Sequence, residues 1–160
     1  MNRRPLFAIG TTGMVATAVI WVLAVYVERW LGISPIEMGA TFRWIFFTLF
    51  AADFSATVLW SLVVLAPSRR ETKLMTAGPY RWVRHPLYSA IIFSGTGMVA
   101  IWHRSWAVIF SVIIINFFWT WHVRKEERDM LMRFGEEYRE YMRSTGQFFP
   151  RFRPLESDRD

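Results

Sequence analysis

The fold is decided by residues 85–123, which read HPLYSAIIFSGTGMVAIWHRSWAVIFSVIIINFFWTWHV. Within this stretch Arg104 is the one Asp, Glu, Lys or Arg, and it separates two apolar runs, 86–103 and 105–123. Each run approaches the roughly 20 residues that a helix needs to cross the hydrocarbon layer of a bilayer. A helix is required there because every backbone polar group must be satisfied within its own segment. The sequence therefore predicts a tight hairpin of two membrane-spanning helices.

Two further apolar runs precede this hairpin. Residues 5–27 contain no Asp, Glu, Lys, Arg or His, and residues 44–66 contain one such residue, Asp53. A cleaved signal peptide is the less favoured interpretation of residues 5–27, because the apolar run is too long and no small-residue cleavage site follows it. We expect an all-α, multi-span transmembrane bundle of about four spans, formed by residues 1–160 as a single domain.

Composition agrees with a membrane protein. The 160 residues are 53% hydrophobic, 18% aromatic and only 20% charged, which is more apolar surface than a soluble core of this size can hide. The net charge of +6 would also suit nucleic acid, but the basic residues flank apolar runs, so an anionic membrane surface explains them better and no nucleic-acid partner is expected.

The basic residues also predict an orientation. With four spans, sixteen of the nineteen Lys and Arg residues fall on the side that holds both ends of the chain and the loop 67–84. The positive-inside rule then places both termini in the cytoplasm, in the plasma or inner membrane of a prokaryote. Tryptophans should line the two interfaces as aromatic belts: Trp30, Trp44, Trp102 and Trp106 on the far side, and Trp82, Trp119 and Trp121 on the cytoplasmic side.

Residues 124–153 differ from the rest of the chain because they are densely charged. Apolar side chains between Val123 and Met142 recur at helical spacing, which predicts a C-terminal amphipathic cytoplasmic helix that folds back over the loop. Gly135 makes an unbroken helix less certain, and Thr145-Gly146 is typical of a helix end. No cysteine is present, and His85, His103 and His122 have no paired ligand spacing, so no metal site is expected.

Polar groups gather at one face of the predicted membrane. Pro86 suits the first turn of a helix, whose unpaired amides form a weakly positive pole. An antiparallel hairpin brings this helix start close to the exit of the next helix, so two groups should meet: Arg84, His85 and Tyr88 with Arg124, Glu126 and Glu127. Such a cluster can bind a ligand that is both cationic and anionic, although ordinary pairing of interfacial side chains is an open alternative.

Three other features leave both structural and functional interpretations open. Gly95 and Gly97 more often allow close helix packing than ligand contact. Asp53 should face the bundle, because an ionised carboxylate near the middle of a bilayer costs about 2.5–3.5 kcal/mol, and it is either functional or paired internally. Asn116 is more typical of an interhelical hydrogen bond.

One combination of motifs is specific. The stretch 78–88 (GPYRWVRHPLY), the pair Glu126-Glu127 and residues 134–141 (FGEEYREY) together resemble the isoprenylcysteine carboxyl methyltransferase family, which groups with the phospholipid N-methyltransferases. The resemblance runs from about Leu74 to Phe152. It implies an integral-membrane enzyme that transfers a methyl group from S-adenosylmethionine, releasing S-adenosylhomocysteine, to a lipophilic acceptor such as an isoprenylcysteine-like carboxylate or a lipid head group.

The same resemblance implies roles for individual residues. The catalytic residues would be Arg84, Arg124 and Glu127, with the two arginines steering an acidic group of the acceptor. Residues 124–153 would cap the cofactor, with Tyr138, Tyr141 and Pro150 in the lid. The cofactor-binding residues would be Gly78, Tyr80, His85, Pro86, Tyr88, Gly95, Gly97, Glu126, Glu127, Tyr138 and Tyr141.

Two alternatives remain at this stage. Membrane sterol reductases share a similar C-terminal cradle and use NADPH, but paired glutamates are poor partners for a 2′-phosphate. A non-enzymatic membrane subunit would instead use the charged loop to dock a partner. The first two spans match no motif, so the acceptor and the oligomeric state are not predicted.

Overall fold

The computed structural model describes residues 7–65 and 73–151, and it is helical almost throughout. No named strand occurs in these two ranges; Val83 and Gly146 form an isolated parallel bridge. The elements in chain order are α1 (Phe7–Trp30), α2 (Ala40–Val64), η2 (Gly78–Arg81), α3 (Pro86–Ala90), η3 (Ile91–Gly95), α4 (Thr96–His103), α5 (Trp106–His122), α6 (Arg124–Phe134) and α7 (Glu136–Ser144).

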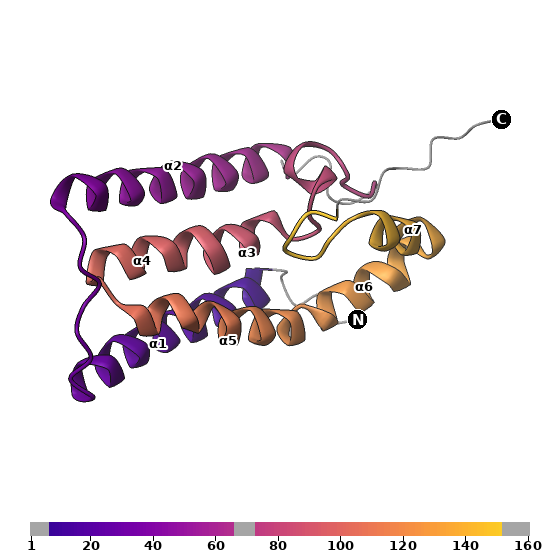
Figure 1. Cartoon of the computed structure of the whole chain (residues 1–160). Coiled ribbons are helices and arrows are strands. Elements are labelled where there is room, and N and C mark those ends of the chain that lie inside the picture. Colours follow the sequence, from indigo (N-terminus) through magenta and orange to yellow (C-terminus); the bar gives the residue numbers. More distant parts are fainter. Residues whose placement is uncertain (1–6, 66–72, 152–160) are drawn as a thin grey trace.

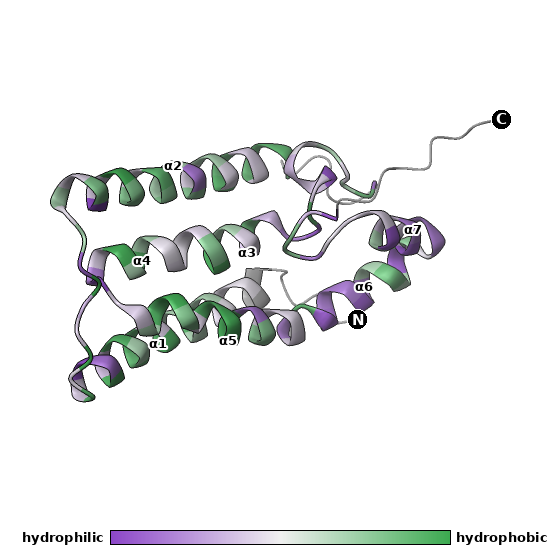
Figure 2. Cartoon of the chain, in the orientation of Figure 1, coloured by the Kyte–Doolittle hydropathy of each residue, from purple (hydrophilic) through white to green (hydrophobic). Residues whose placement is uncertain are grey.

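The prediction of an all-α membrane-spanning bundle is confirmed. Among the described residues, three helices are long and apolar enough to cross a bilayer, starting at Gly10, Ala40 and Trp106. The third of these helices has an apolar part, α5, which is followed after Val123 by the charged α6. Large apolar side chains on α1, α2 and α5 are exposed, as expected for surfaces that face lipid. Figure 2 shows the change from these apolar helices to the hydrophilic α6 and α7.

The run 86–103 is helical, but it is not one regular α-helix. Its middle segment, η3, is a π-helical segment of five residues between α3 and α4. Within η3, the Ser94 hydroxyl donates a hydrogen bond to Asp53 of α2. Asp53 is therefore paired across the contact of α2 with η3, although the residue as a whole stays exposed.

The helices pack as two neighbouring pairs. In Figure 1, α1 lies beside α5, and α2 lies beside the continuous run of α3, η3 and α4. The core between them contains Ile92, Ile115 and Trp119. The expectation that Trp119 lies in an interfacial belt is wrong: its side chain is fully buried, and its Nε1 donates to Thr17 Oγ1 at 2.9 Å.

The two ends of the bundle differ. One end, called the polar end below, holds the start of α3, the end of α5, and both α6 and α7 (Figure 1). At the opposite end, called the far end, a buried carboxylate caps α5. Glu28 accepts hydrogen bonds from the Ser105 hydroxyl, from Trp106 N at 3.0 Å and from Ala107 N at 3.2 Å. A negative charge at a helix N-terminus is favourable because the amides there are unpaired and the helix dipole is positive.

The charged C-terminal part forms two helices where one was expected. Gly135 separates α6 from α7 with φ +56°, a conformation that L-residues with a side chain rarely adopt. This turn brings Tyr138 and Tyr141 of α7 onto Leu74, forming a small buried cluster beside the main core. The helix ends at Ser144, and Thr145 is extended, as the sequence predicted.

Candidate functional site

The centre of the candidate site is a buried ion pair at the polar end. Arg84 lies just before α3, and its Nε donates to Glu127 Oε1 of α6 at 2.9 Å. His85 is the residue that precedes the first turn of α3, and its Nε2 lies 3.3 Å from the same Glu127 oxygen. The side chains of Arg84, His85 and Glu127 are only 9%, 7% and 12% exposed. One carboxylate thus holds two consecutive residues of the α3 entry.

The neighbouring carboxylate has a different partner. Tyr88, on the first turn of α3, donates its hydroxyl to Glu126 Oε2 at 3.3 Å. The Tyr88 ring is stacked between two other rings, with a centroid separation of 4.3 Å to Trp119 and 5.5 Å to His85. Because Trp119 lies in the bundle core, this stack ties the site to the membrane-spanning helices.

The segment that follows α7 closes one side of this cluster through backbone hydrogen bonds. Arg84 N donates to Gly146 O at 2.8 Å, and His85 N donates to Gln147 O at 3.1 Å. The Arg84 guanidinium also donates to Thr145 O and to Met142 O, and Ser89 Oγ donates to Phe148 O at 2.7 Å. Residues 145–148, which we call the closing segment, are therefore attached to the α3 entry, that is, to Arg84, His85 and the first turn of α3.

Gly146 is essential to the shape of the closing segment. A Cβ built on Gly146 would lie 1.6 Å from the carbonyl oxygen of Phe149, a separation that no real side chain can adopt. Only glycine therefore allows the chain to turn back after its pairing with residues 84 and 85.

The two glutamates differ in their electrostatics. Burial alone raises the pKa of Glu127, but the hydrogen bond with His85 and the charge of Arg84 outweigh it and lower the pKa to about 2. Burial raises the pKa of Glu126, and the negative charge of Glu127 acts in the same direction. The site therefore holds one firmly ionised carboxylate beside one that is easier to protonate.

The three other tyrosines of the predicted set lie on η2 and α7. Tyr141 donates its hydroxyl to the backbone oxygen of Tyr80 at 2.5 Å, which fastens α7 to η2. Tyr138 is buried, and burial raises its pKa, to which the charge of Glu127 adds. Pro86 is buried at the first position of α3, and Pro150 follows the closing segment.

The predicted glycines are packed against other helices. A Cβ on Gly78 would lie 2.8 Å from Val64, one on Gly95 would lie 3.2 Å from Trp21, and one on Gly97 would lie 2.6 Å from Phe50. All three contacts are with α1 or α2, so in this structure these glycines allow close packing of helices.

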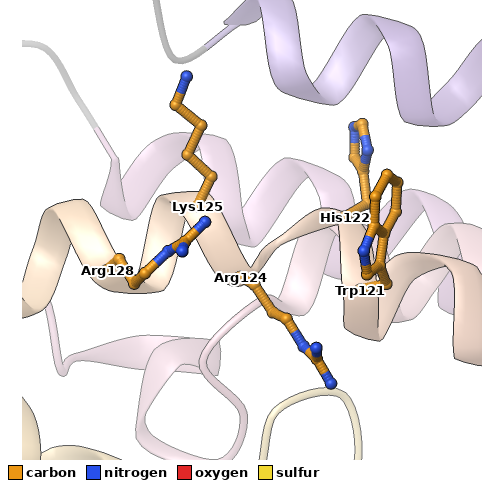
Figure 3. Close-up of a pocket in the computed structure, with 5 residues that line it drawn as sticks. All are labelled: Trp121, His122, Arg124, Lys125 and Arg128. Carbon is orange, nitrogen blue, oxygen red and sulfur yellow. The ribbon is translucent and has the colours of Figure 1, made fainter.

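Arg124, the remaining predicted residue, lines a pocket of about 440 Å³ on the outer side of the junction between α5 and α6. Figure 3 shows this pocket, with Arg124 and Lys125 pointing in opposite directions. Arg124 is exposed and makes no hydrogen bond or ion pair with another described residue. Arg84, by contrast, is fully engaged inside the site.

The sequence assigned residues 124–153 to a cofactor cap, but it did not single out residues 145–148 or place Trp119 in this region. Backbone-to-backbone pairing such as that of Gly146 and Gln147 leaves little signal in side-chain type, because it uses groups that every residue has. Gly146 was noted as part of a helix end, and its position after the last helix was the available signal. Among residues 7–65 and 73–151, no group of three potential metal ligands comes together.

The chain matches a family model described as the isoprenylcysteine carboxyl methyltransferase (ICMT) family over residues 38–132, which is more than half of its length. This match spans α2 to α6 and includes the Arg84, His85, Tyr88, Glu126 and Glu127 cluster.

Curated relatives were also found. The chain is 30% identical over 102 residues to the nickel-cobalt-cadmium resistance protein NccN of Alcaligenes xylosoxydans xylosoxydans, covering 62% of this chain and 46% of that protein. It is 30% identical over 93 residues to the cobalt-zinc-cadmium resistance protein CzcN of Cupriavidus metallidurans, covering 58% and 42%. A methanethiol S-methyltransferase of Pseudomonas deceptionensis is 30% identical over 127 residues, covering 78% and 44%. The chain thus spans less than half the length of these relatives.

Proposed function

Since the chain belongs to the isoprenylcysteine carboxyl methyltransferase family, we propose that it is an integral-membrane methyltransferase that uses S-adenosylmethionine. The observation that carries the proposal is the convergence of the α3 entry with the paired glutamates of α6, joined by the 2.9 Å contact of Arg84 with Glu127. The proposed acceptor is lipophilic, and the proposed orientation keeps both termini in the cytoplasm.

The donor and acceptor groups of this cluster suit the proposed cofactor. S-adenosylmethionine has an ammonium, a sulfonium, a carboxylate and a ribose diol, and when bound it supplies an already activated methyl group. A carboxylate has about four acceptor positions. Glu126 uses one of them, for the Tyr88 hydroxyl. Glu126 is therefore the group in this cluster with the most capacity left to accept from an ammonium or a diol.

Glu127 has a different proposed role, because its partners are residues of the chain itself. It fixes Arg84 and His85 at the α3 entry, and Arg84 in turn holds the carbonyls of Thr145 and Met142. Glu127 is thus proposed to position the site and its closing segment.

Catalysis is proposed to rest mainly on positioning and on exclusion of water. The donor needs no activation, so holding the acceptor in line with the methyl group supplies most of the rate gain. A carboxylate acceptor needs no base, whereas an amine or a thiol has to lose a proton. Arg124 is exposed at the edge of α6 and is proposed to steer an acidic group of the acceptor, while Arg84 is already engaged with Glu127.

A second pocket supports a lipophilic acceptor. It has a volume of about 450 Å³ and lies among α2, η3, α4 and α5, where its lining is almost entirely apolar. The lining residues include Phe46, Phe50, Phe93 and Val112. An acceptor that reaches the polar end through this membrane-embedded region would carry an apolar body, since charged molecules are costly in hydrocarbon.

The test is calorimetric titration of the detergent-solubilised chain with S-adenosylhomocysteine. Binding is expected for the unchanged protein, and Glu126→Gln should weaken it by at least about tenfold, the cost of losing one charge-assisted hydrogen bond. His85→Ala should weaken it as well. Glu136→Gln, at an exposed acid on α7, is the matched control and should bind normally.

The outcomes separate the alternatives. Binding of NADPH in place of S-adenosylhomocysteine would identify a reductase. Binding of neither compound by a folded protein would favour a non-enzymatic subunit. Equal S-adenosylhomocysteine affinity in Glu126→Gln, His85→Ala and the unchanged protein would remove the site assignment.

A further inference from the structure

A basic pocket at the junction of α5 and α6 lies outside the cluster described above. It has a volume of about 440 Å³ and is lined by Trp121, His122, Arg124, Lys125 and Arg128 (Figure 3). The side chains of Arg124, Lys125 and Arg128 are exposed and make no hydrogen bond or ion pair with any described residue. Three cationic residues thus line the pocket, with Arg124 and Lys125 pointing in opposite directions, and Asp129 is the neighbouring exposed acid.

The position of the pocket along the helix indicates its surroundings. The apolar surface of α5 ends at Trp121 and His122, and the charged α6 begins at Arg124. In a chain whose α5 crosses a bilayer, this junction falls at the level of the lipid head groups. Trp121 is 65% exposed there, as is typical of a tryptophan at a membrane interface.

We propose that this pocket binds the phosphate head group of an anionic membrane phospholipid. Lys125 and Arg128 are the cations proposed to attract the phosphodiester, and Trp121 is proposed to contact the upper part of the acyl chains. Juxtamembrane lysines and arginines attract anionic lipids in this way, and the attraction acts within a Debye length of the surface. The membrane is the proposed source of the ligand because Trp121, which lines the pocket, is 65% exposed near the end of the apolar α5.

The pocket is linked to the rest of the bundle and to α6. The ring of His122 forms one wall, and its Nε2 lies 3.1 Å from Thr12 Oγ1 of α1. Glu126 and Glu127 of the same helix make their contacts with Tyr88, Arg84 and His85 on the side of α3. A bound phosphate would therefore hold the start of α6 from outside while the glutamates hold it from within.

The experiment uses the full chain in lipid nanodiscs with spin-labelled phosphatidylglycerol and spin-labelled phosphatidylcholine. The unchanged protein should immobilise the anionic lipid in preference to the zwitterionic one, and 1 M NaCl should reduce that preference. The double variant K125Q/R128Q should lower the preference by about fivefold for each cation removed. Arg124 is left unchanged because it is also proposed to steer the acceptor.

A matched control removes one lysine and one arginine that lie outside the pocket. The double variant K73Q/R81Q alters one exposed lysine and one exposed arginine near η2, and it should keep most of the preference. Circular dichroism of each variant checks that the helices are intact. Equal loss in both double variants would overturn the pocket assignment, because a general charge effect would then explain the preference.

Three further outcomes would overturn the proposal, and the first two do not depend on any variant. An unchanged protein that binds both lipids equally has no anionic lipid site. Displacement of the spin-labelled phosphatidylglycerol by millimolar inorganic phosphate would show that the pocket takes soluble phosphate instead. Retention of the full preference by folded K125Q/R128Q would also contradict it. None of these results depends on methyl transfer, so they are separate from the proposed function.

Discussion

Carboxylates are buried at both ends of this bundle, but they are held by different kinds of groups. At the far end Glu28 accepts from two backbone amides of α5 and from the Ser105 hydroxyl. At the polar end Glu126 and Glu127 are held by the side chains of Tyr88, Arg84 and His85. Amides at a helix start form part of the helix itself, whereas side chains can rearrange around a ligand. The comparison identifies Glu28 as a structural cap and the polar-end pair as the functional candidates.

The largest expected effect comes from removing the cap. Glu28→Ala leaves a hydroxyl and two amides at the start of α5 without their acceptor, and we expect it to lower the free energy of unfolding by about 3 kcal/mol. Unfolding by SDS, followed by circular dichroism in micelles, measures this loss. Glu37→Ala, at an exposed acid of the same end, should have little effect. Equal stability of the two variants would contradict the assignment of Glu28 as a cap.

Substitutions of the two polar-end glutamates should have different effects on the closing segment. Glu127→Gln removes the charge that holds Arg84, so the closing segment should detach more often. Hydrogen exchange of the Arg84 and His85 amides, which donate to Gly146 and Gln147, should become about tenfold faster. Glu126→Gln should leave this exchange nearly unchanged. If Glu126→Gln accelerates it equally, the two carboxylates do not have the separate roles proposed for them.

A smaller effect should appear in the pH dependence of stability. The pKa of Glu127 is lowered from 4.5 to about 2 in the folded chain, so the unfolded state binds the proton more readily. The stabilisation from this group is present above about pH 4.5 and is lost as the pH falls toward 2. Melting temperatures in detergent should therefore fall less steeply between pH 5 and pH 3 in Glu127→Gln than in the unchanged protein. Parallel curves for the two proteins would contradict the lowered pKa.

The smallest effect is expected on the surface of α7. Arg139 Nη1 lies 2.6 Å from Glu136 Oε2, but both side chains are more than half exposed. Exposed pairs of this kind contribute about 0.2–1 kcal/mol, so Arg139→Ala should lie at the low end of that range in the SDS assay. A loss comparable to that of Glu28→Ala would show that α7 contributes far more to stability than its contacts indicate.

Much of the fold was predictable because length and hydropathy decide which segments can cross a membrane. The four apolar runs correspond to helical segments whose ends differ from the expectation by a few residues, although the third is divided by η3. One helix was expected after Val123, and the low helical preference of Gly135 weakened that expectation without predicting the two helices that the structure has. The hairpin argument also anticipated that Arg84, His85 and Tyr88 would meet Glu126 and Glu127. Their roles in binding and catalysis stay predictions.

Other features depend on tertiary packing and could not be read from residue type. Trp119 was assigned to an interfacial belt because tryptophan is common there, yet its indole is buried against Tyr88 and donates to Thr17. Glu28 lies directly after an apolar run, and its partners are backbone amides far away in the sequence. The attachment of Gly146 and Gln147 to the α3 entry likewise uses main-chain groups alone.

The π-helical segment η3 affects the direction in which the side chains at the start of α3 face. Each wider turn accommodates one more residue than an α-helical turn, so the part of the helix before it is rotated by about 100° relative to a regular helix. Tyr88 and His85 therefore face α6 in a direction that is set independently of how α4 packs on α2. Deleting one residue of η3 would convert it to regular helix and swing the tyrosine away from its glutamate, while the hydrocarbon-embedded half of the helix kept its neighbours.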